Sequence, residues 1–133
     1  MQEILLAEDN PADVYLIREA LHEHQVHCEI RVATDGDEVL RIMFGEPANP
    51  AGTQFRLIIL DMNLPRHDGI EILQRLHQAA EFAHVPVVVL TSSDSPRDRQ
   101  IANQLGATRY LRKPSSLEQF LSLGAVFKDL LAQ

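Results

Sequence analysis

Apolar and polar positions follow two alternating patterns along the chain. Five short apolar runs have the composition of buried strands, and each precedes a stretch in which apolar residues recur every three or four positions, as on one face of a helix. The runs lie at Ile4–Ala7, Cys28–Ala33, Leu57–Leu60, Pro86–Leu90 and Tyr110–Leu111. Repeated strand and helix units are typical of a parallel sheet. The sequence therefore predicts an α/β protein with a doubly wound sheet and helices on both of its faces.

Capping residues mark where several helices begin and end. Asn10 stands directly before Pro11, which predicts that the first helix begins after an asparagine N-cap. Asp13 falls in the first turn of this helix. Ser95 precedes a proline in the same way and predicts the start of a fourth helix, which Gly106 ends.

Polar residues directly follow four of the apolar runs. Glu8 and Asp9 come after the first run, Asp61 after the third, Thr91 after the fourth and Lys113 close behind the fifth. In an open parallel sheet, ligands bind outside the carboxyl ends of the strands. We therefore expect three carboxylates, one hydroxyl and one ammonium to share a pocket.

The charges of this pocket indicate a metal ion. Three carboxylates packed together resist ionisation unless a cation lies among them. Mg²⁺ is the natural candidate because it takes oxygen ligands and is usually bound by one or two carboxylates together with phosphate oxygens. One carboxylate can then attack a phosphoryl donor as a nucleophile. The Thr91 hydroxyl and the Lys113 ammonium suit the oxygens of the new phosphoryl group.

These residues lie in segments that resemble the receiver domain of two-component response regulators. The matching segments are ILLAEDNPAD, LIILDMNLPRHDG, PVVVLTSS and GATRYLRKP, which keep their family order and touch nearly the whole chain. The resemblance implies a flavodoxin-like sheet of five strands in the order 2-1-3-4-5. It implies that Asp61 is the phosphoacceptor. It further implies that Asp9 and Asp61 bind Mg²⁺ directly, that Glu8 acts through water, and that the backbone carbonyl of Asn63 completes the site.

The same resemblance assigns a switch. Thr91 and Tyr110 resemble the family's switch pair, and Lys113 resembles its phosphate-contacting lysine. The Tyr110 ring would alternate between an exposed and an inward position. Family members carry a cis peptide bond at the position of Lys113 and Pro114, and cis bonds are inexpensive only before proline.

The resemblance also implies the partners. A sensor histidine kinase would donate the phosphoryl group to Asp61, and the modified domain would pass the signal on through a face made by the fourth helix, the fifth strand and the fifth helix. The segment EDNPADVYLIREAL and the long loop before the third strand resemble the single-domain receivers that serve phytochrome-type histidine kinases.

Two other classes of protein share parts of this pattern. A Mg²⁺-dependent phosphatase or phosphotransferase acting on small molecules would share the aspartate nucleophile. Such enzymes usually have a second acid two residues after the nucleophile, where this chain has Asn63. A flavodoxin-like cofactor carrier would need a phosphate-binding loop after the first strand, where this chain has acids. The sequence therefore favours a signalling domain that is not an enzyme.

Length and charge limit the remaining possibilities. The 133 residues suit one domain, which we expect to span residues 1–133 without an output domain. A net charge of −7 with scattered basic residues argues against nucleic-acid binding. The acidic start MQEILLAED is unlike a signal peptide, and no apolar run approaches the roughly 20 residues of a membrane span. We expect a cytoplasmic protein without membrane contact.

Three further features lead to narrower expectations. The segment Gly45–Gln54 has two prolines and no periodicity, so we expect a surface loop that is long enough to contact a partner. Cys28, the single cysteine, suits a reducing compartment and is expected to be a small core side chain. His67 lies close to the Asp61 loop and is the histidine best placed to sense pH or to contact a kinase.

The last helix, expected from about Ser116 to about Leu131, carries two adjoining apolar strips. At 100° per residue, the strip that would seat the helix on the sheet consists of Leu117, Phe120, Leu121, Phe127 and Leu131. A second strip falls outside it, and a monomer would expose it; its members are Leu123, Val126 and Leu130. An exposed strip of this kind predicts a homodimer. The alternative is a broad core helix covered by a neighbouring loop.

Overall fold

The computed structural model describes residues 2–45, 55–93 and 95–133. The strands are β1 Gln2–Ala7, β2 Cys28–Ala33, β3 Phe55–Leu60, β4 Val87–Thr91 and β5 Arg109–Arg112. The helices are α1 Pro11–Glu23, α2 Gly36–Phe44, α3 Gly69–Gln78, α4 Pro96–Gln104 and α5 Leu117–Leu131, with a 3-10 helix at Ala80–Phe82. All strand pairs are parallel, in the order β2-β1-β3-β4-β5. The predicted fold and strand order are confirmed.

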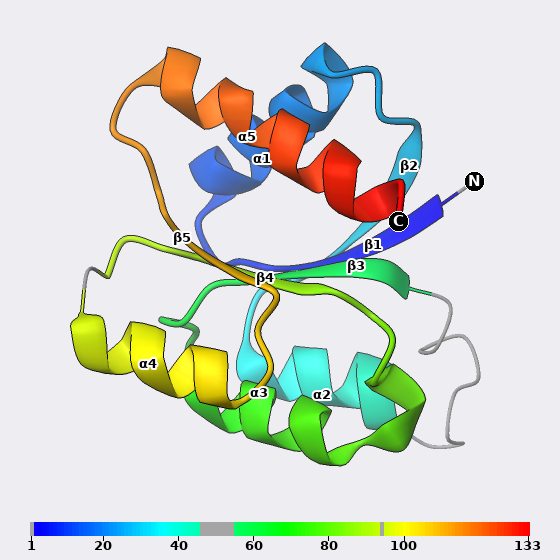
Figure 1. Cartoon of the computed structure of the whole chain (residues 1–133), viewed down its shortest axis with the longest axis vertical. Coiled ribbons are helices and arrows are strands. Elements are labelled where there is room, and N and C mark those ends of the chain that lie inside the picture. The colour runs from blue at the N-terminus through cyan, green and yellow to red at the C-terminus, as the bar shows by residue number, and fades with distance from the viewer. Residues whose placement is uncertain (1, 46–54, 94) are drawn as a thin grey trace.

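The helices form a layer on each side of the sheet. Helices α1 and α5 cover one face, and α2, α3 and α4 cover the other (Figure 1). Most of the predicted loop at 45–54 lies outside the described residues, so its predicted role in partner contact stays a prediction. Among the described helices, none combines the length and the hydropathy that crossing a membrane requires.

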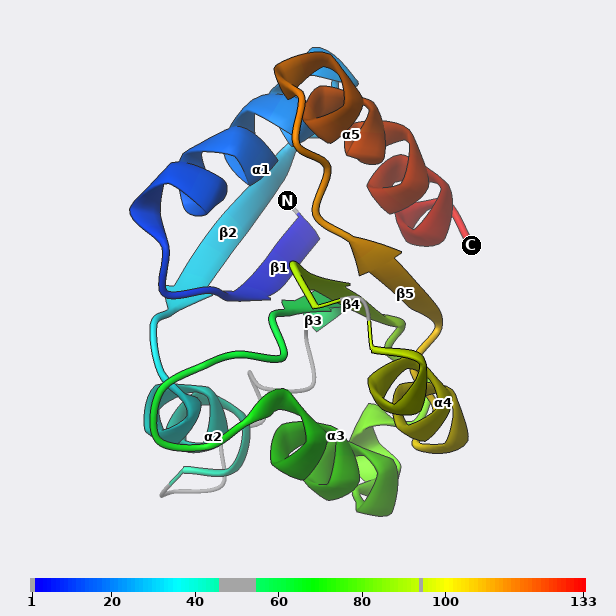
Figure 2. The ribbon, with the colours of Figure 1, turned by 90° about the vertical axis from the view of Figure 1, so that its left-hand side faces the viewer.

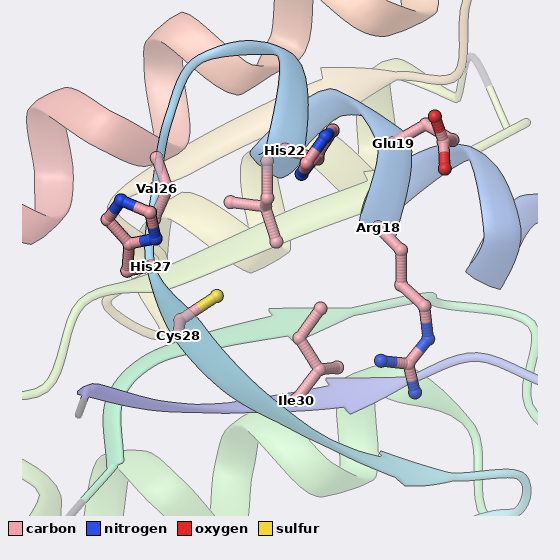
Figure 3. Close-up of a pocket in the computed structure, with 8 residues that line it drawn as sticks. Arg18, Glu19, His22, Val26, His27, Cys28 and Ile30 are labelled. Carbon is pink, nitrogen blue, oxygen red and sulfur yellow. The ribbon is translucent and has the colours of Figure 1, made fainter.

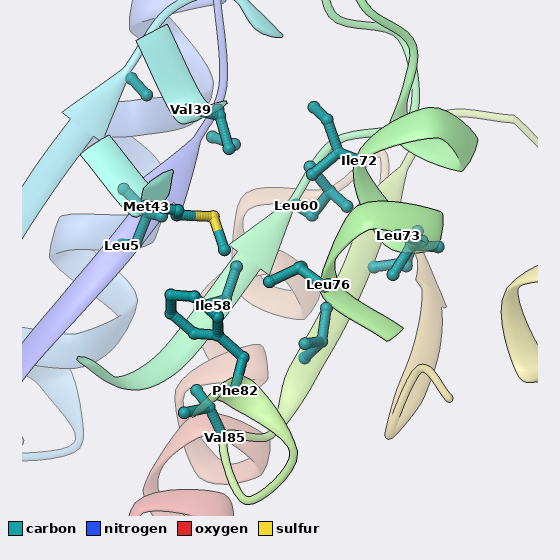
Figure 4. Close-up of a cluster of buried hydrophobic side chains, with 14 of the residues drawn as sticks. Leu5, Val39, Met43, Ile58, Leu60, Ile72, Leu73, Leu76, Phe82 and Val85 are labelled. Atoms are coloured by element: carbon teal, nitrogen blue, oxygen red, sulfur yellow. The ribbon is translucent and has the colours of Figure 1, made fainter. Parts of the chain in front are cut away.

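The central strands are buried because both of their faces are covered. Successive strand residues point to opposite faces, so Leu5 packs into one core and Leu6 into the other. Figure 4 shows the core under α2 and α3, where Leu60 of β3 lies beside Ile72 of α3 and Ile58 lies beside Phe82. This alternation explains why the strands read as continuous apolar runs in the sequence.

Side-chain caps define where the helices begin. The Oδ1 atom of Asn10 accepts hydrogen bonds from the backbone N–H groups of Ala12 at 2.9 Å and Asp13 at 3.4 Å, which confirms it as the N-cap of α1. Ser95 accepts from the N–H of Asp98 in the same way at the start of α4. Beyond the other end of α4, Gly106 has a φ of +88°, a left-handed conformation that favours glycine and ends the helix.

The expected exposed strip on α5 is wrong. Leu123 and Leu130 are buried in the core between the sheet, α1 and α5, and Val126 packs against that core while half-buried. Leu117, expected to face the sheet, is 61% exposed instead.

The physical reason is that α5 packs against α1 as well as against the sheet. Gly124 allows this approach, because a Cβ atom added there would collide with the carbonyl oxygen of Ala20 in α1. The buried face of α5 is therefore broader than a single sheet contact requires, and it includes the positions that the helical projection left outside. The dimer argument built on Leu123, Val126 and Leu130 loses its basis.

Candidate functional site

The carboxyl ends of β1, β3, β4 and β5 bring the predicted polar residues to one edge of the sheet, and the loops that follow these strands face the viewer in Figure 2. Ala7 of β1 is in register with Leu60 of β3. The next residues, Glu8 and Asp61, therefore emerge side by side. On the other side of β3, the backbone N–H of Lys113 donates to the carbonyl of Thr91 at 2.8 Å, which ties the β5 end to β4.

Three carboxylates meet at this edge, as the sequence predicts. Glu8, Asp9 and Asp61 each have an oxygen within 4.8 Å of an oxygen of the other two. Glu8 and Asp61 are buried, whereas Asp9 is exposed. The cluster is thus open to solvent at Asp9 and closed around the other two carboxylates.

Lys113 balances part of this negative charge. Its Nζ atom lies 2.7 Å from Oε1 of Glu8 and 2.9 Å from Oδ2 of Asp61. A third carboxylate, Oδ2 of Asp13, lies 2.8 Å away. Sequence reasoning missed this contact, because an acid in the first turn of a helix is explained by the helix dipole alone. The sequence did place Asp13 only four residues after Asp9, the second of the acids that follow β1.

Burial and charge shift the ionisation of the cluster. Burial, together with the charge of Asp61 and despite the hydrogen bond from Lys113, raises the pKa of Glu8 to about 7. Burial alone would lower the pKa of Lys113, but the hydrogen bonds to Asp13, Glu8 and Asp61 outweigh it and raise that pKa above its ordinary value. The surroundings thus favour the charged form of Lys113 and disfavour the charged form of Glu8.

Thr91 and Asn63 complete the polar surroundings of Asp61. The backbone N–H of Asn63 donates to Oδ1 of Asp61 at 3.0 Å, so both oxygens of this carboxylate accept hydrogen bonds. The Nδ2 of Asn63 donates to Oγ1 of the buried Thr91 at 3.4 Å. The N–H of Ser93 donates to the same hydroxyl at 3.2 Å. Asn63 thus links the predicted phosphoacceptor to the predicted switch residue.

Tyr110 lies inward. Its side chain is buried in the core beneath α3 and α4. The guanidinium of Arg99 in α4 lies over the ring, 4.7 Å from its centroid, and Nη1 of Arg99 donates to the backbone carbonyl of Tyr110 at 3.3 Å. A stacked arginine of this kind favours the ring position below it. Arg99 of α4 therefore stabilises the inward position of the Tyr110 ring.

The loop after Asp61 is fastened to the N-terminus of α2. The N–H of Gly36 donates to the carbonyl of Pro65 at 3.0 Å, and a Cβ atom added at Gly36 would collide with the Cβ of His67. The ring of His67 binds Oδ1 of Asp37 at 2.7 Å and Oε2 of Glu71 at 2.8 Å. Hydrogen bonds to Glu71 and Asp37 raise the pKa of His67. His67, singled out from the sequence, therefore has a structural role that the sequence did not show.

The acidic cluster suits a divalent cation. Its donors are hard carboxylate oxygens, its three carboxylates outnumber the single ammonium of Lys113, and Asp9 is open to solvent. The roles assigned to Glu8, Asp9, Asp61 and Asn63 as ligands stay predictions, and so does the cis bond before Pro114.

Cys28 and its neighbouring histidines lie far from this edge. Cys28 packs against the α1 and α5 core but is only half-buried, and burial raises the pKa of its thiol. Figure 3 shows it in an open hollow of about 420 Å³ between α1 and β2, beside His22 and His27. The expectation of a small core side chain is thus met only in part.

Known proteins resemble this chain over nearly its full length. Response regulator Rcp1 of Synechocystis sp. is 32% identical over 120 residues, which are 90% of this chain and 82% of that protein. The transcriptional regulatory protein TrcR of Mycobacterium tuberculosis is 34% identical over 90% of this chain, but the chain spans only 42% of its length.

Solved structures of response regulators are also similar to this chain. The phosphorylated cyanobacterial phytochrome response regulator RcpA superposes with a TM-score of 0.88 at 33% identity, covering 99% of this chain and 94% of the other. The bacteriophytochrome response regulator AtBRR gives 0.75 at 34% identity, covering 98% and 92%. The family model described as the response regulator receiver domain matches residues 4–123. The chain therefore belongs to the response regulator receiver domain family.

Proposed function

We propose that the protein is a phosphorylation-controlled switch in which Asp61 accepts a phosphoryl group from the phosphohistidine of a sensor histidine kinase. The observation that carries this proposal is the setting of Asp61. Its buried carboxylate accepts a hydrogen bond on each oxygen, from the N–H of Asn63 at 3.0 Å and from Lys113 at 2.9 Å, and it lies beside two further carboxylates.

The transfer needs few protein groups. An oxygen of Asp61 attacks the phosphorus, the bond between phosphorus and the histidine nitrogen breaks, and its electron pair leaves with the imidazole of the kinase. Lys113 offers an ammonium to the new phosphoryl oxygens, and its three carboxylate partners keep it protonated. The protein thereby promotes its own phosphorylation and dephosphorylation and transforms no separate substrate.

Mg²⁺ is the metal that we propose for the acidic cluster. Asp9 and Asp61 would bind it directly, Glu8 through water, and Asn63 through its backbone carbonyl. When bound, it offsets the negative charge that gathers on the phosphoryl oxygens. A solved structure of Rcp1, 29% identical to this chain with a TM-score of 0.86 over 97% of this chain and 93% of that one, is described as Mn²⁺-bound, which supports a divalent ion at this kind of site.

The switch proceeds from Thr91 to Tyr110. In the structure, Oγ1 of Thr91 accepts hydrogen bonds from Asn63 and Ser93. Tyr110 lies inward, with the guanidinium of Arg99 over its ring. A phosphoryl group on Asp61 offers Thr91 a stronger, charged acceptor. Tyr110 already lies inward in the structure, so phosphorylation would favour this position over an exposed one and thereby alter the surface formed by α4, β5 and α5.

The partners are proteins. Two of the similar proteins are named phytochrome or bacteriophytochrome response regulators, which supports a phytochrome-type histidine kinase as the donor. A net charge of −7 favours a protein target over nucleic acid and over anionic membrane surfaces. We propose that the switch acts in the cytoplasm beside its kinase.

Phosphorylation by acetyl phosphate tests the proposal. With Mg²⁺ present, we expect one acyl phosphate, located on Asp61 by mass spectrometry, and none in Asp61→Asn or after EDTA is added. Asp37→Asn, which removes a surface acid, is the matched control and should be labelled normally. Labelling that persists in Asp61→Asn contradicts the proposal.

Calorimetric titration with Mg²⁺ tests the ligand assignment separately. Asp9→Ala should abolish binding because that carboxylate would touch the ion, whereas Glu8→Gln should weaken binding less. An Asp9→Ala variant that binds as tightly as the parent protein rules the assignment out.

A further inference from the structure

One carboxylate at the functional edge has no place in the metal cluster. Asp13 lies in α1, and its Oδ2 atom is 2.8 Å from Nζ of Lys113. That distance equals, within 0.1 Å, those from Lys113 to Glu8 and Asp61. The ammonium has three protons, and the three carboxylates provide an acceptor for each. Asp13 therefore accepts one of the three hydrogen bonds that the Lys113 ammonium can donate.

The position of Asp13 is fixed by the way α1 begins. Asn10 caps the helix by accepting from the N–H groups of Ala12 and Asp13 itself, and Pro11 sets the first turn. The helix then packs against α5, where Gly124 allows close approach. Asp13 is thus carried on a rigid element, and its carboxylate is mostly shielded, with 18% of the side chain exposed.

The backbone of Lys113 is tied to β4, but its ammonium lies at the end of a long side chain. Lys113 follows β5 directly and reaches the site through a flexible four-carbon side chain. Two of its partners, Glu8 and Asp61, belong to the proposed metal and phosphoryl site. These carboxylates would also interact with a bound cation or carry the phosphoryl group. Asp13 is not a member of the carboxylate cluster, so its contact with Lys113 is the one of the three that neither event engages.

We propose that Asp13 is a positioning residue that holds the Lys113 ammonium over Asp61 before and after phosphoryl transfer. The inference rests on the proposed function of Asp61 and extends it to a residue on a different element. An acid that served only the dipole of α1 would need no contact with the lysine.

The chain offers a direct spectroscopic test because it has two lysines, Lys113 and the exposed Lys128. In protein labelled with [¹⁵N]lysine, protons on a side-chain ammonium held by carboxylates exchange slowly with water. We expect a resolved Nζ signal from Lys113 and a broadened one from Lys128. Asp13→Asn should bring the exchange of Lys113 close to that of Lys128, while Asp13→Glu should restore part of the difference.

The kinetic test uses acetyl phosphate with saturating Mg²⁺. Asp13→Asn should lower the maximal rate of Asp61 phosphorylation about tenfold, the effect expected when one charge-assisted hydrogen bond to a reacting group is lost. The KM for acetyl phosphate and the Mg²⁺ affinity should change little, because Asp13 touches neither. Glu19→Gln removes an exposed charge from the same helix and should leave both the rate and the lysine signal unchanged.

The outcomes separate the two proposals. If the parent protein is not phosphorylated on Asp61 at all, the proposed function fails, while the lysine exchange experiment still reports on Asp13. If Lys113 and Lys128 exchange equally fast in the parent protein, or if Asp13→Asn folds and keeps both the slow exchange and the parent rate, the positioning role is overturned. Should Asp13→Asn fail to fold, the parent signal and the Asp13→Glu variant decide.

Discussion

Two clusters of charged residues fasten the segment around Asp61 to its neighbours, and they differ in exposure. The Lys113 cluster, formed by Glu8, Asp13, Asp61 and Lys113, has side chains between 2% and 18% exposed. The His67 cluster, formed by Asp35, Asp37, Arg66, His67 and Glu71, has side chains between 28% and 66% exposed. In both clusters, nitrogen atoms of basic side chains lie 2.7 to 3.7 Å from carboxylate oxygens.

The comparison shows that similar contacts have different consequences. Water screens the ion pairs of an exposed cluster, so these add little to stability. In a shielded cluster, the loss of one partner leaves a charge without compensation, and the cost is several times larger. The Lys113 cluster therefore depends on its charges, whereas the His67 region depends mainly on how its backbone packs. Four predictions test this difference.

The largest effect is expected from Lys113→Met, measured without divalent cations. Glu8 and Asp61 would stay buried with no cation between them, and the free energy of unfolding should fall by about 3 kcal/mol in urea. Mg²⁺ should reverse much of the loss, since it would replace the missing charge. Lys128→Met is the exposed control, and a similar loss there would contradict the comparison.

A smaller effect is expected from Gly36→Ala beside the His67 cluster. The new methyl group would collide with the Cβ of His67 and lie 2.8 Å from its carbonyl oxygen. We expect the free energy of unfolding to fall by about 2 kcal/mol, as for other overpacked sites. Thermal and urea unfolding measure this change. A neutral result would mean that the loop after Asp61 is not fastened to α2 by its backbone.

Arg66→Gly should be slightly stabilising. Arg66 has a φ of +75°, a left-handed conformation that costs side chains with a Cβ about 1 kcal/mol. Glycine removes this strain, although its greater freedom in the unfolded chain offsets part of the gain, and we expect a net increase of about 0.5 kcal/mol. Arg66→Ala keeps the strain and loses the ion pairs, so it should be less stable than the parent. A destabilised Arg66→Gly variant would show that the exposed ion pairs outweigh the strain.

The smallest effect concerns pH. The hydrogen bonds to Glu71 and Asp37 raise the pKa of His67 in the folded state, so its contribution to stability is fully present below its unfolded pKa of about 6.5. That contribution is lost as the pH rises through the higher folded pKa. The stability difference between the parent and His67→Gln should therefore shrink above neutral pH. A difference that stays constant with pH would exclude protonation of His67 as its source.

Much of the functional edge could be predicted from the sequence because it depends on chain order. Glu8, Asp61 and Lys113 directly follow strands and Thr91 ends one, and the carboxyl ends of parallel strands lie at the same edge of the sheet. Asn10 and Ser95 could be identified as caps because a cap acts within three residues of its own position. Local chemistry and the period of the apolar runs sufficed for these residues.

Other features were decided only by the tertiary structure. The contact between Asp13 and Lys113 joins positions 100 residues apart, and only the assembled edge of the sheet brings them together. The buried face of α5 widened to include Leu123 and Leu130 because α1 became a second packing partner, admitted by Gly124. A helical projection shows which side of a helix is apolar. How many other elements pack against that side depends on how the helices and the sheet assemble. The sequence by itself thus determined the sheet and the residues at its edge, and tertiary packing determined which of their neighbours support them.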